Sequence, residues 1–330
     1  MAHGFDLSQL GAALGDKCQD PDVKTDFLTA MMFNPRLEEN ITVLTGVIDE
    51  IPLPNMAFGD PLAPMADSEN ITYKTGVVTP DADVLKVKDC IMAVRMNPWK
   101  LWPTYLGVLA RQAYKAKQLG QDYFAMPFED FVLGKLKEKA AEQLYLNAIF
   151  LGERDNAGTT SSDLFDGFNK KIADRITAGR ITAVATGAIN TTDVISQLKS
   201  VARNLSEASQ GNNQNMHVSS SIFDMYADKF TVISNPSLVA TDTAAQLQQP
   251  RLNKIAISGT NAMLVREPGL GTSGRVICTS PDHLFLGFNS DPSSLTFEVQ
   301  KEDLNLKLLM VFKAGVELGL DAEISVNNQA

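Results

Sequence analysis

The feature that most constrains the fold is a long helical stretch, which runs from Pro127 to Gly152. A helix of about 25 residues is about 37 Å long, several turns more than is usual in a globular domain. Pro127 suits a first helical turn, where its missing N–H has no partner to lose. Gly152 is typical of the left-handed residue that closes a helix. Because the interior holds no catalytic or metal-ligand spacing, the sequence predicts a structural strut.

One face of this strut is apolar and the rest is charged. On a wheel of 3.6 residues per turn the apolar positions fall in one arc, which contains Val132, Leu133, Leu136, Ala140, Leu144 and Leu151. Lys135 with Glu138, and Lys139 with Glu142, are three residues apart and are predicted to pair on the surface. The strut is therefore expected to lie on a core with its charged side in water.

The composition limits the partners that the chain can have. Of its 330 residues, 44% are apolar and 21% are charged, which is ordinary for a folded protein of one or two domains. The net charge of −10 argues against tight binding to nucleic acid backbones, which needs clustered Lys and Arg. A surface that only encloses DNA need not be basic. No apolar run approaches the roughly 18 residues that span a bilayer, and the three distant cysteines indicate no disulfide or zinc framework.

Residues 1–38 are predicted to form an N-terminal arm with one or two short helices. They carry short apolar stretches but too little apolar mass for a separate domain. We expect this arm to pack on something else. A frayed terminus is the alternative for residues 1–20.

The segment from Glu39 to Arg95 has the character of a β ribbon. A loop with four prolines, Pro52, Pro54, Pro61 and Pro64, makes a central strand unfavourable there. A two-stranded ribbon is marginal alone in water, so it must lie against its own domain or against a neighbouring subunit. The strand candidates are ITVLTGVI (41–48), ITYKTGVV (71–78) and VLKVKDCIMAV (84–94), the last two separated by the turn signal Thr79-Pro80-Asp81.

Residues 96–116 are predicted to form a helix that starts after Asn97-Pro98 and breaks near Pro103. Trp99 and Trp102 are expected in the core or in an interface. A base-stacking role is the weaker reading, because the sequence shows no basic cluster around them.

The remaining chain mixes helices and strands. Residues 152–168 read as a polar loop, Thr192 or Asp193 caps a helix from Val194 to Leu205, and residues 219–230 form another helix. Short strand candidates follow, namely KIAIS, NAMLVREP, GRVICTS, HLFLGF and LTFEV. From Leu304 to Leu320 every second residue is apolar, with Glu317 and Asp321 on the wetter parity, so we expect one long curved strand or two consecutive ones. The pattern is that of an α+β fold.

No motif accounts for catalysis. Gly269-Leu-Gly271-Thr-Ser-Gly274 fits the dinucleotide-binding GxGxxG, but a β-branched stretch follows where that motif needs a helix, so a hairpin turn is predicted. His217 and His283 stand in no catalytic motif and are expected to be structural, and the acids of the 152–168 loop do not follow calcium-loop spacing. We therefore predict no catalytic, cofactor-binding or metal site and no enzyme activity. If the glycine motif did bind a nucleotide, the alternative function would be that of a nucleotide-dependent enzyme.

Two stretches are the most telling about ancestry. They are EKAAEQLYLNAIFLG leading into DLFDGF, and FEVQKEDLNLKLLMVFKAGVELGLDAEI near the end. With the order of the predicted elements, over about residues 39–326, the chain resembles the major capsid proteins of tailed phages. These proteins have the Hong Kong 97-type fold, which encapsulin shells share.

The resemblance implies a division of the chain. An N-terminal arm (1–38) would precede residues 39–125, which hold an extended loop at about 46–95 and a connecting helix. A peripheral domain (126–189) with spine helix 127–151 would be followed by an axial domain (190–290) and a C-terminal strand segment (291–330). The extended loop would lie over the neighbouring subunit, with inter-subunit contacts from Leu62, Met65, Ile71, Tyr73 and Lys74.

The resemblance also implies the function and the partners. The chain would be a structural capsid protein that assembles into pentamers and hexamers around double-stranded DNA, without sequence-specific binding. A portal and a decoration protein would be partners. The scaffolding protein would be a separate chain, because the arm is too short for a fused scaffold. Assembly in the host cytoplasm and a place in the virion capsid would follow, with no membrane. Lys74 as a cross-linking donor has no convincing acceptor, so that chemistry is not carried over. An encapsulin-type nanocompartment shell, or another phage structural protein, is the alternative.

Overall fold

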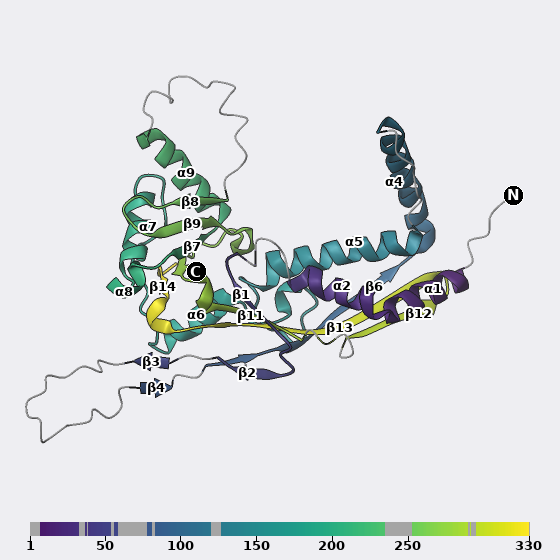
Figure 1. Ribbon diagram of the computed structural model, residues 1–330, viewed down its shortest axis with the longest axis horizontal. Helices are drawn as coiled ribbons and strands as arrows, with labels where there is room; N and C mark the ends of the chain where they lie inside the picture. Colours follow the sequence, from purple (N-terminus) through teal and green to yellow (C-terminus); the bar gives the residue numbers. More distant parts are fainter. Residues whose placement is uncertain are drawn as a thin grey trace, which may run out of the picture.

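The computed structural model describes residues 7–32, 37, 39–53, 56–58, 78–80, 83–119, 127–234, 253–289, 291 and 295–329. In it, a long helix and a long strand run side by side along the body, and a second, smaller sheet lies at one end (Figure 1). A β ribbon and one helix project from opposite ends of this body. Helix and strand are thus mixed, as the sequence predicted.

The first sheet is built around one long strand. Its order is β1-β11-β13-β12, and β6 pairs with the other edge of β13. The bounds are β1 Thr42–Thr45, β6 Lys88–Met96, β11 Leu284–Phe288, β12 Thr296–Glu302 and β13 Asn305–Leu318. The alternating segment is therefore a single strand. Its apolar parity is buried throughout, from Leu306 to Leu318.

The last part of β13 departs from the predicted pattern. From Ala314 onwards both faces of the strand are buried, including Glu317, which the sequence placed on the wetter parity. The reason is local: Glu317 forms an ion pair with the buried Arg175, so its charge is balanced inside the protein.

A layer of helices covers the first sheet. The helices are α1 (Leu7–Gln19), α2 (Pro21–Met32) and α5 (Phe128–Gln143), and α1 contacts β12 while α2 contacts α5. Phe27 of α2 packs edge-on against Phe297 of β12, with ring centroids 5.3 Å apart. The two predicted N-terminal helices exist, but the expectation that they pack on something else is wrong for residues 7–32. Their apolar faces are covered by this chain's own strut and sheet.

The strut ends differently from the prediction. After Gln143 the helix continues as a π-helix, Leu144–Ala148, in which the Ile149 N–H donates to the carbonyl of Leu144 at 3.2 Å. Gly152 does not have a positive φ. It is required because a Cβ there would lie 2.4 Å from the Ala148 carbonyl oxygen. Leu151, assigned to the apolar arc, is exposed, because the chain has left the helix at that point.

Helix α4 (Pro98–Gln118) runs unbroken through Pro103, contrary to the prediction. Pro103 lies in the second turn, so it removes one hydrogen bond near the helix start without ending the helix. Asn97 supplies the cap, since its Oδ1 accepts from the backbone N–H of Trp99 at 3.1 Å. Trp102 packs against Tyr105 and the α5 side chain Phe128 in the core, whereas Trp99 is exposed.

The second sheet has its own core. Its order is β14-β10-β7-β9-β8, and α7 and α9 supply most of the helical side of that core. The bounds are α7 Val194–Arg203, α8 Glu207–Gln210, β7 Gln214–Val218, α9 Ser220–Ser234, β8 Lys254–Ala256, β9 Ala262–Arg266, β10 Ile277–Thr279 and β14 Ser325–Val326. Asp193 occupies the cap position of α7 but makes no side-chain cap bond. Asn190 instead accepts from the N–H groups of Thr192 and Asp193.

Two strands belong to a different sheet from the one that the predicted domain ranges imply. Strand β11 falls inside the range 190–290 yet pairs with β13 in the first sheet, and β14 near the C-terminus joins the second. All five residues of β11 are buried, as expected for a strand covered on both faces.

The ribbon consists of two short strand pairs. These are β2 (Glu50–Pro52) with β5 (Val84–Lys86), and β3 (Met56–Phe58) with β4 (Val78–Pro80). Thr79 and Pro80 are paired strand residues and not a turn. Of the candidate strand 71–78, residues 71–77 lie outside the described part of the chain. The remaining described helices are α6 (Phe168–Thr177) and the short 3-10 segments Ser161–Asp163, Pro268–Leu270, Pro281–His283 and Asp321–Glu323.

We expect Gly315→Ala to lower the free energy of unfolding by about 1–3 kcal/mol. A Cβ at Gly315 would lie 2.3 Å from the Lys86 carbonyl oxygen, where the ribbon root crosses β13. Gly134→Ala is the matched control, because its Cβ meets nothing within 4 Å in α5 and the change should be stabilising. Urea unfolding of both variants measures the difference. Equal stabilities would contradict this close approach.

Candidate assembly site

The root of the ribbon is fixed to the first sheet by a small separate core. Val47, Leu53, Leu85 and Val87 are buried together with Phe285 of β11. Leu85 packs so closely on β11 that a Cβ at Gly287 would lie 2.6 Å from its Cδ2. The root is thus part of the body, and only the segment beyond it projects.

Beyond its root the ribbon leaves the body. Glu50, Ile51 and Pro52 of β2 are all exposed, and Ile48 beside them is 67% exposed. Figure 1 shows β3 and β4 lying clear of both sheets. Two strand pairs of three residues each do not form an independently stable unit in water. This surface therefore has the physical properties of one that a partner covers.

A buried ion network ties the ribbon root to the body. Arg175 of α6 donates through Nη2 to Glu317 of β13 at 2.9 Å, and the same nitrogen lies 2.9 Å from Asp83 at the start of the returning ribbon strand. Arg175 Nη1 also donates to Asp321 and, at 2.8 Å, to the Gly319 carbonyl oxygen. One buried guanidinium thus joins α6, the end of β13 and the ribbon.

A second shell of charges completes the network. Arg180 holds Asp83 in a two-pronged hydrogen bond with N···O distances of 2.9 and 2.8 Å, and also binds Asp321. Lys171 pairs with Glu317 at 2.8 Å. Three cations thereby face three carboxylates, so no charge in the network is left uncompensated.

The carboxylate of Asp83 is held in its ionised form. Burial alone would raise its pKa, but the hydrogen bonds from Arg180 and the charge of Arg175 outweigh burial and lower the pKa below its ordinary value. The hydrogen bond to Asp83 in turn raises the pKa of Arg180. Asp83 and Arg180 therefore both carry their charges at neutral pH.

The predicted contact residues Leu62, Met65, Ile71, Tyr73 and Lys74 all lie outside the described residues. The contacts assigned to them stay predictions. The ion network at the ribbon root was not predicted from the sequence. It consists of Asp83, Lys171, Arg175, Arg180, Glu317 and Asp321. The one available signal was Glu317, an acid between Gly315 and Gly319 in an otherwise strongly apolar strand.

The glycine motif at 269–274 does not have the geometry of a dinucleotide-binding turn. A 3-10 turn at Pro268–Leu270 follows β9, Gly271 has φ +53°, and strand β10 comes next where a helix N-terminus would be needed. The predicted hairpin is also wrong. Both β9 and β10 pair with β7, on opposite edges, so the motif carries the chain across that strand.

Both described histidines lie in structural contacts. His283 Nε2 is 2.7 Å from a carboxylate oxygen of Glu323. His217 is fully buried in β7, with Nδ1 3.7 Å from Glu267 and its ring 5.9 Å from that of Phe150. Tyr145 of the π-helix donates to the same Glu267, so this polar cluster joins the end of the strut to the second sheet.

The remaining chemistry-bearing groups do not assemble into a reactive set. Among the described residues, no three His, Cys, Asp or Glu side chains are grouped as metal ligands. Cys18, Cys90 and Cys278 are free and buried, and burial raises the pKa of each thiol to about 12. No described helix is both long and apolar enough to cross a bilayer.

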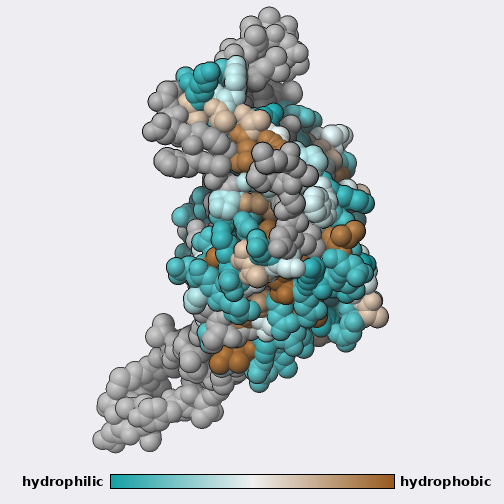
Figure 2. All heavy atoms as spheres, turned by 90° about the vertical axis from the view of Figure 1, so that its right-hand side faces the viewer, coloured by the Kyte–Doolittle hydropathy of each residue, from teal (hydrophilic) through white to brown (hydrophobic). Residues whose placement is uncertain are grey.

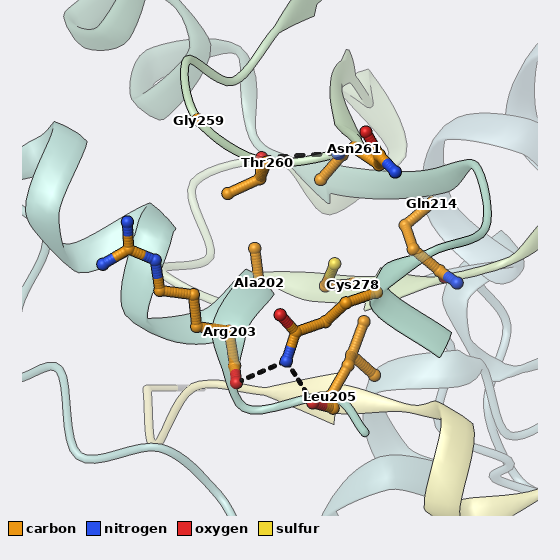
Figure 3. A pocket seen from close by; sticks show the side chains of 10 residues that line it. Ala202, Arg203, Leu205, Gln214, Gly259, Thr260, Asn261 and Cys278 are labelled. Carbon is orange, nitrogen blue, oxygen red and sulfur yellow. Dashed lines mark hydrogen bonds between the residues drawn. The ribbon is translucent and has the colours of Figure 1, made fainter. Parts of the chain in front are cut away.

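A cavity of about 430 Å³ lies beside the second sheet, and Figure 3 shows its lining residues, which include Arg203, Gln214, Thr260, Asn261 and Cys278. Arg203 is the only charged side chain among the described residues that line it, and the buried Cys278 thiol is not ionised at neutral pH. Thr260 donates to the Ile257 carbonyl oxygen of its own loop, and Asn261 donates to the Gly211 carbonyl oxygen after α8. The lining therefore holds no nucleophile paired with a base.

No protein-family model matches the chain, and no curated protein matches it by sequence. Its structure is similar to a chain of the satellite phage P4 procapsid that includes the size determination (Sid) protein. The TM-score is 0.57 at 12% identity, over 99% of this chain and 92% of that one. The capsid of an empty GTA particle is similar with a TM-score of 0.51 at 12% identity, over 88% of each chain.

These likenesses concern the fold, and they extend over almost the whole chain. The chain has the Hong Kong 97-type capsid fold, as the sequence resemblance implied. The division into arm, extended loop, peripheral domain and axial domain stays a prediction.

We expect Arg175→Ala to destabilise the fold by about 3 kcal/mol, because it leaves the buried Glu317 short of its main counter-charge. Lys171 and Arg180 remain nearby and keep the loss at the lower end of the range for a broken buried pair. Lys135→Ala removes an exposed pair on the strut and should change stability by well under about 1 kcal/mol. Urea unfolding compares the two variants, and similar losses would contradict a structural role for the network.

Acid should weaken the network through Asp83. A lowered folded-state pKa means that the carboxylate stabilises the fold above its ordinary pKa of 3.8, and that this contribution is lost as pH falls through the folded value. Between about pH 4 and pH 2 we expect the free energy of unfolding to fall less steeply in Asp83→Asn than in the wild type. Urea titrations at several pH values measure both slopes. Identical slopes would show that Asp83 does not gain this stabilisation on folding.

Proposed function

We propose that the chain is the major capsid protein of a tailed phage, which self-assembles into pentamers and hexamers that form an icosahedral shell around double-stranded viral DNA. The observation that supports this most is the fold, which is similar to a phage procapsid chain over 99% of this chain.

The ribbon supplies the physical reason for assembly. Its root is fixed by the small core and by the Arg175 network, so its direction from the body is set within one copy. Its outer strands gain cover when they lie on a neighbouring copy. A contact between two different surfaces is head-to-tail, and repeated contacts of this kind close into rings when the rotation permits.

The finer assignments belong to the same proposal. The copies would assemble in the host cytoplasm, with a portal, a separate scaffolding protein and a decoration protein as partners, and would remain in the virion. The shell would enclose DNA without reading its sequence, which fits an acidic chain with a net charge of −10.

Negative-stain electron microscopy of the expressed protein tests the proposal directly. We expect closed shells or rings of five and six copies. Shells that co-purify with an enzyme cargo and no DNA would favour the encapsulin-type alternative. Protein that stays monomeric in all buffers, with its ribbon folded onto its own body, would overturn both.

A shortened ribbon separates folding from assembly. Deleting the whole of residues 50–90 would also remove the buried Leu53 and Leu85 and part of β6. The sharper change replaces residues 56–80 by an Asn-Gly turn and leaves β2, β5 and the root core intact. We expect a soluble, folded protein that forms no shells in negative-stain images.

The control for this variant keeps the ribbon and changes an exposed pair elsewhere. Lys139→Ala with Glu142→Ala lies on the wet face of the strut and should assemble as the wild type does. Intact shells from the shortened ribbon, at wild-type yield, would show that the ribbon is not needed for assembly.

A further inference from the structure

Helix α4 carries an unusual concentration of exposed apolar side chains. Trp99, Leu106, Tyr114 and the cap residue Leu119 are each between 47 and 71% exposed. At 100° per residue, Trp99, Leu106 and Tyr114 fall within about 80° of one another, and the buried Tyr105 lies about 100° or more from each of them. Exposed residues of this size gathered on one element mark an interaction surface.

A basic stripe runs beside the apolar one. Lys100, Arg111 and Lys115 are spaced by eleven and four residues, which places them along one line of the helix. Lys117 adds a fourth cation, and α4 contains no acidic residue. None of these cations forms an ion pair with an acid in the described ranges of the chain. The helix thus presents a positive and an apolar stripe side by side.

The body of the same copy covers little of this helix. Only Pro98 and Tyr105 are buried, both in the first half, where Tyr105 packs against Phe128 and Phe131. Figure 1 shows α4 turning away from the end of α5 and projecting from the body. Figure 2, which looks at this end of the molecule, shows hydrophobic patches within a mostly hydrophilic surface.

The charge of the chain identifies a suitable partner. The whole chain has a net charge of −10, and α4 contributes +4, so the rest of each copy carries −14. An acidic protein surface with apolar side chains satisfies both stripes at once. DNA phosphates would satisfy only the basic stripe and would leave Trp99, Leu106 and Tyr114 exposed.

We propose that α4 is an inter-copy docking helix, which binds the acidic surface of a second copy of this chain. The inference rests on the proposed function only in that copies must associate. Its apolar stripe supplies the buried area, and Lys100, Arg111 and Lys115 orient the neighbour by long-range attraction.

Charge reversal on α4 tests the docking. In the variant Lys100→Glu, Arg111→Glu, Lys115→Glu, all three positions are exposed, so the fold should survive, as circular dichroism and thermal unfolding would show. We expect self-association, measured by sedimentation velocity at low salt, to weaken at least tenfold. The matched control is Lys100→Arg, Arg111→Lys, Lys115→Arg, which keeps the charge at the same positions and should associate as the wild type does.

The apolar stripe is tested separately by Leu106→Ser with Tyr114→Ser, which should weaken association without changing the net charge. Salt should weaken association of the wild type but not of the charge-reversed variant, in which the reversed charges repel the acidic neighbour and salt screens that repulsion. Wild-type association in the folded charge-reversed variant would overturn the inference. So would a variant that associates normally but loses binding to a 30-base-pair duplex in fluorescence anisotropy, which would assign α4 to DNA.

Failure of this inference and failure of the proposed function give different results. Wild-type shells in electron microscopy, together with shells from the charge-reversed variant, leave the capsid role in place and remove the docking role of α4. Open oligomers without closed shells, lost in the charge-reversed variant, support the docking helix and contradict the icosahedral shell. A wild type that is strictly monomeric contradicts both.

Discussion

Backbone pairing along both edges of β13 is the interaction on which the rest of the structure depends. One edge pairs with β6, and the other pairs first with β12 and then with β11. Each of these strands brings a different part of the chain to the body. Strand β6 follows the ribbon in the chain, and β12 packs against α1. Strand β11 pairs with β1 and contacts the ribbon root. A single 14-residue strand therefore fixes the relative positions of nearly every described element outside the second sheet.

The Arg175 network acts where this ladder ends. Past Ala314 the strand has no wet face, and the close approach of Lys86 to Gly315 brings the ribbon root directly onto it. A charged network inside a protein costs desolvation and contributes most when every member has a partner. Here it links three segments that backbone hydrogen bonds do not join, namely Asp83, α6 and the end of β13. Direction of the ribbon is thereby set by side-chain electrostatics added to the small apolar core.

The sequence was informative where one periodic signal extended over many residues. The strut, the alternation of β13 and the helices at 194 and 219 were all predictable, because each buries one face against a large core. The π-helix after Gln143 was not predictable, because its Tyr145 bonds to Glu267 beside the second sheet, a contact between distant segments. Pro103 misled because the helix continues past it despite the lost i→i−4 hydrogen bond. Gly152 was predicted to close the helix, and Glu317 was assigned to the wetter parity of the strand. A close backbone approach explains the glycine and the distant Arg175 explains the buried glutamate, and neither can be read from local sequence.

The same limitation explains why the candidate site was only partly predictable. Of the four short ribbon strands, only β5 lies wholly within a predicted β run, because β2 and β3 fall in the proline-rich loop and β4 covers the predicted turn at Thr79-Pro80. Asp83, Arg180 and Asp321 are separated by up to 238 residues and meet only through the fold. The basic stripe of α4 was hidden in a different way. The net charge of −10 is a sum over the whole chain, so it does not reveal that one helix has four cations and no acid. Charge must be counted element by element to show such a surface.

The positions of the two uncovered surfaces constrain how copies can meet. The ribbon and α4 project from opposite ends of the long body (Figure 1). A two-fold contact would place the same surface of both copies together, which leaves one end of each copy uncovered. Head-to-tail contacts let each copy offer both ends to different neighbours. Because the ribbon root is rigidly tied to β13 while α4 begins at the end of β6, the angle between these contacts is set by one sheet. In the proposed shell, rings of five and rings of six would differ in that angle, so the two projecting elements would be the ones that must accommodate the difference.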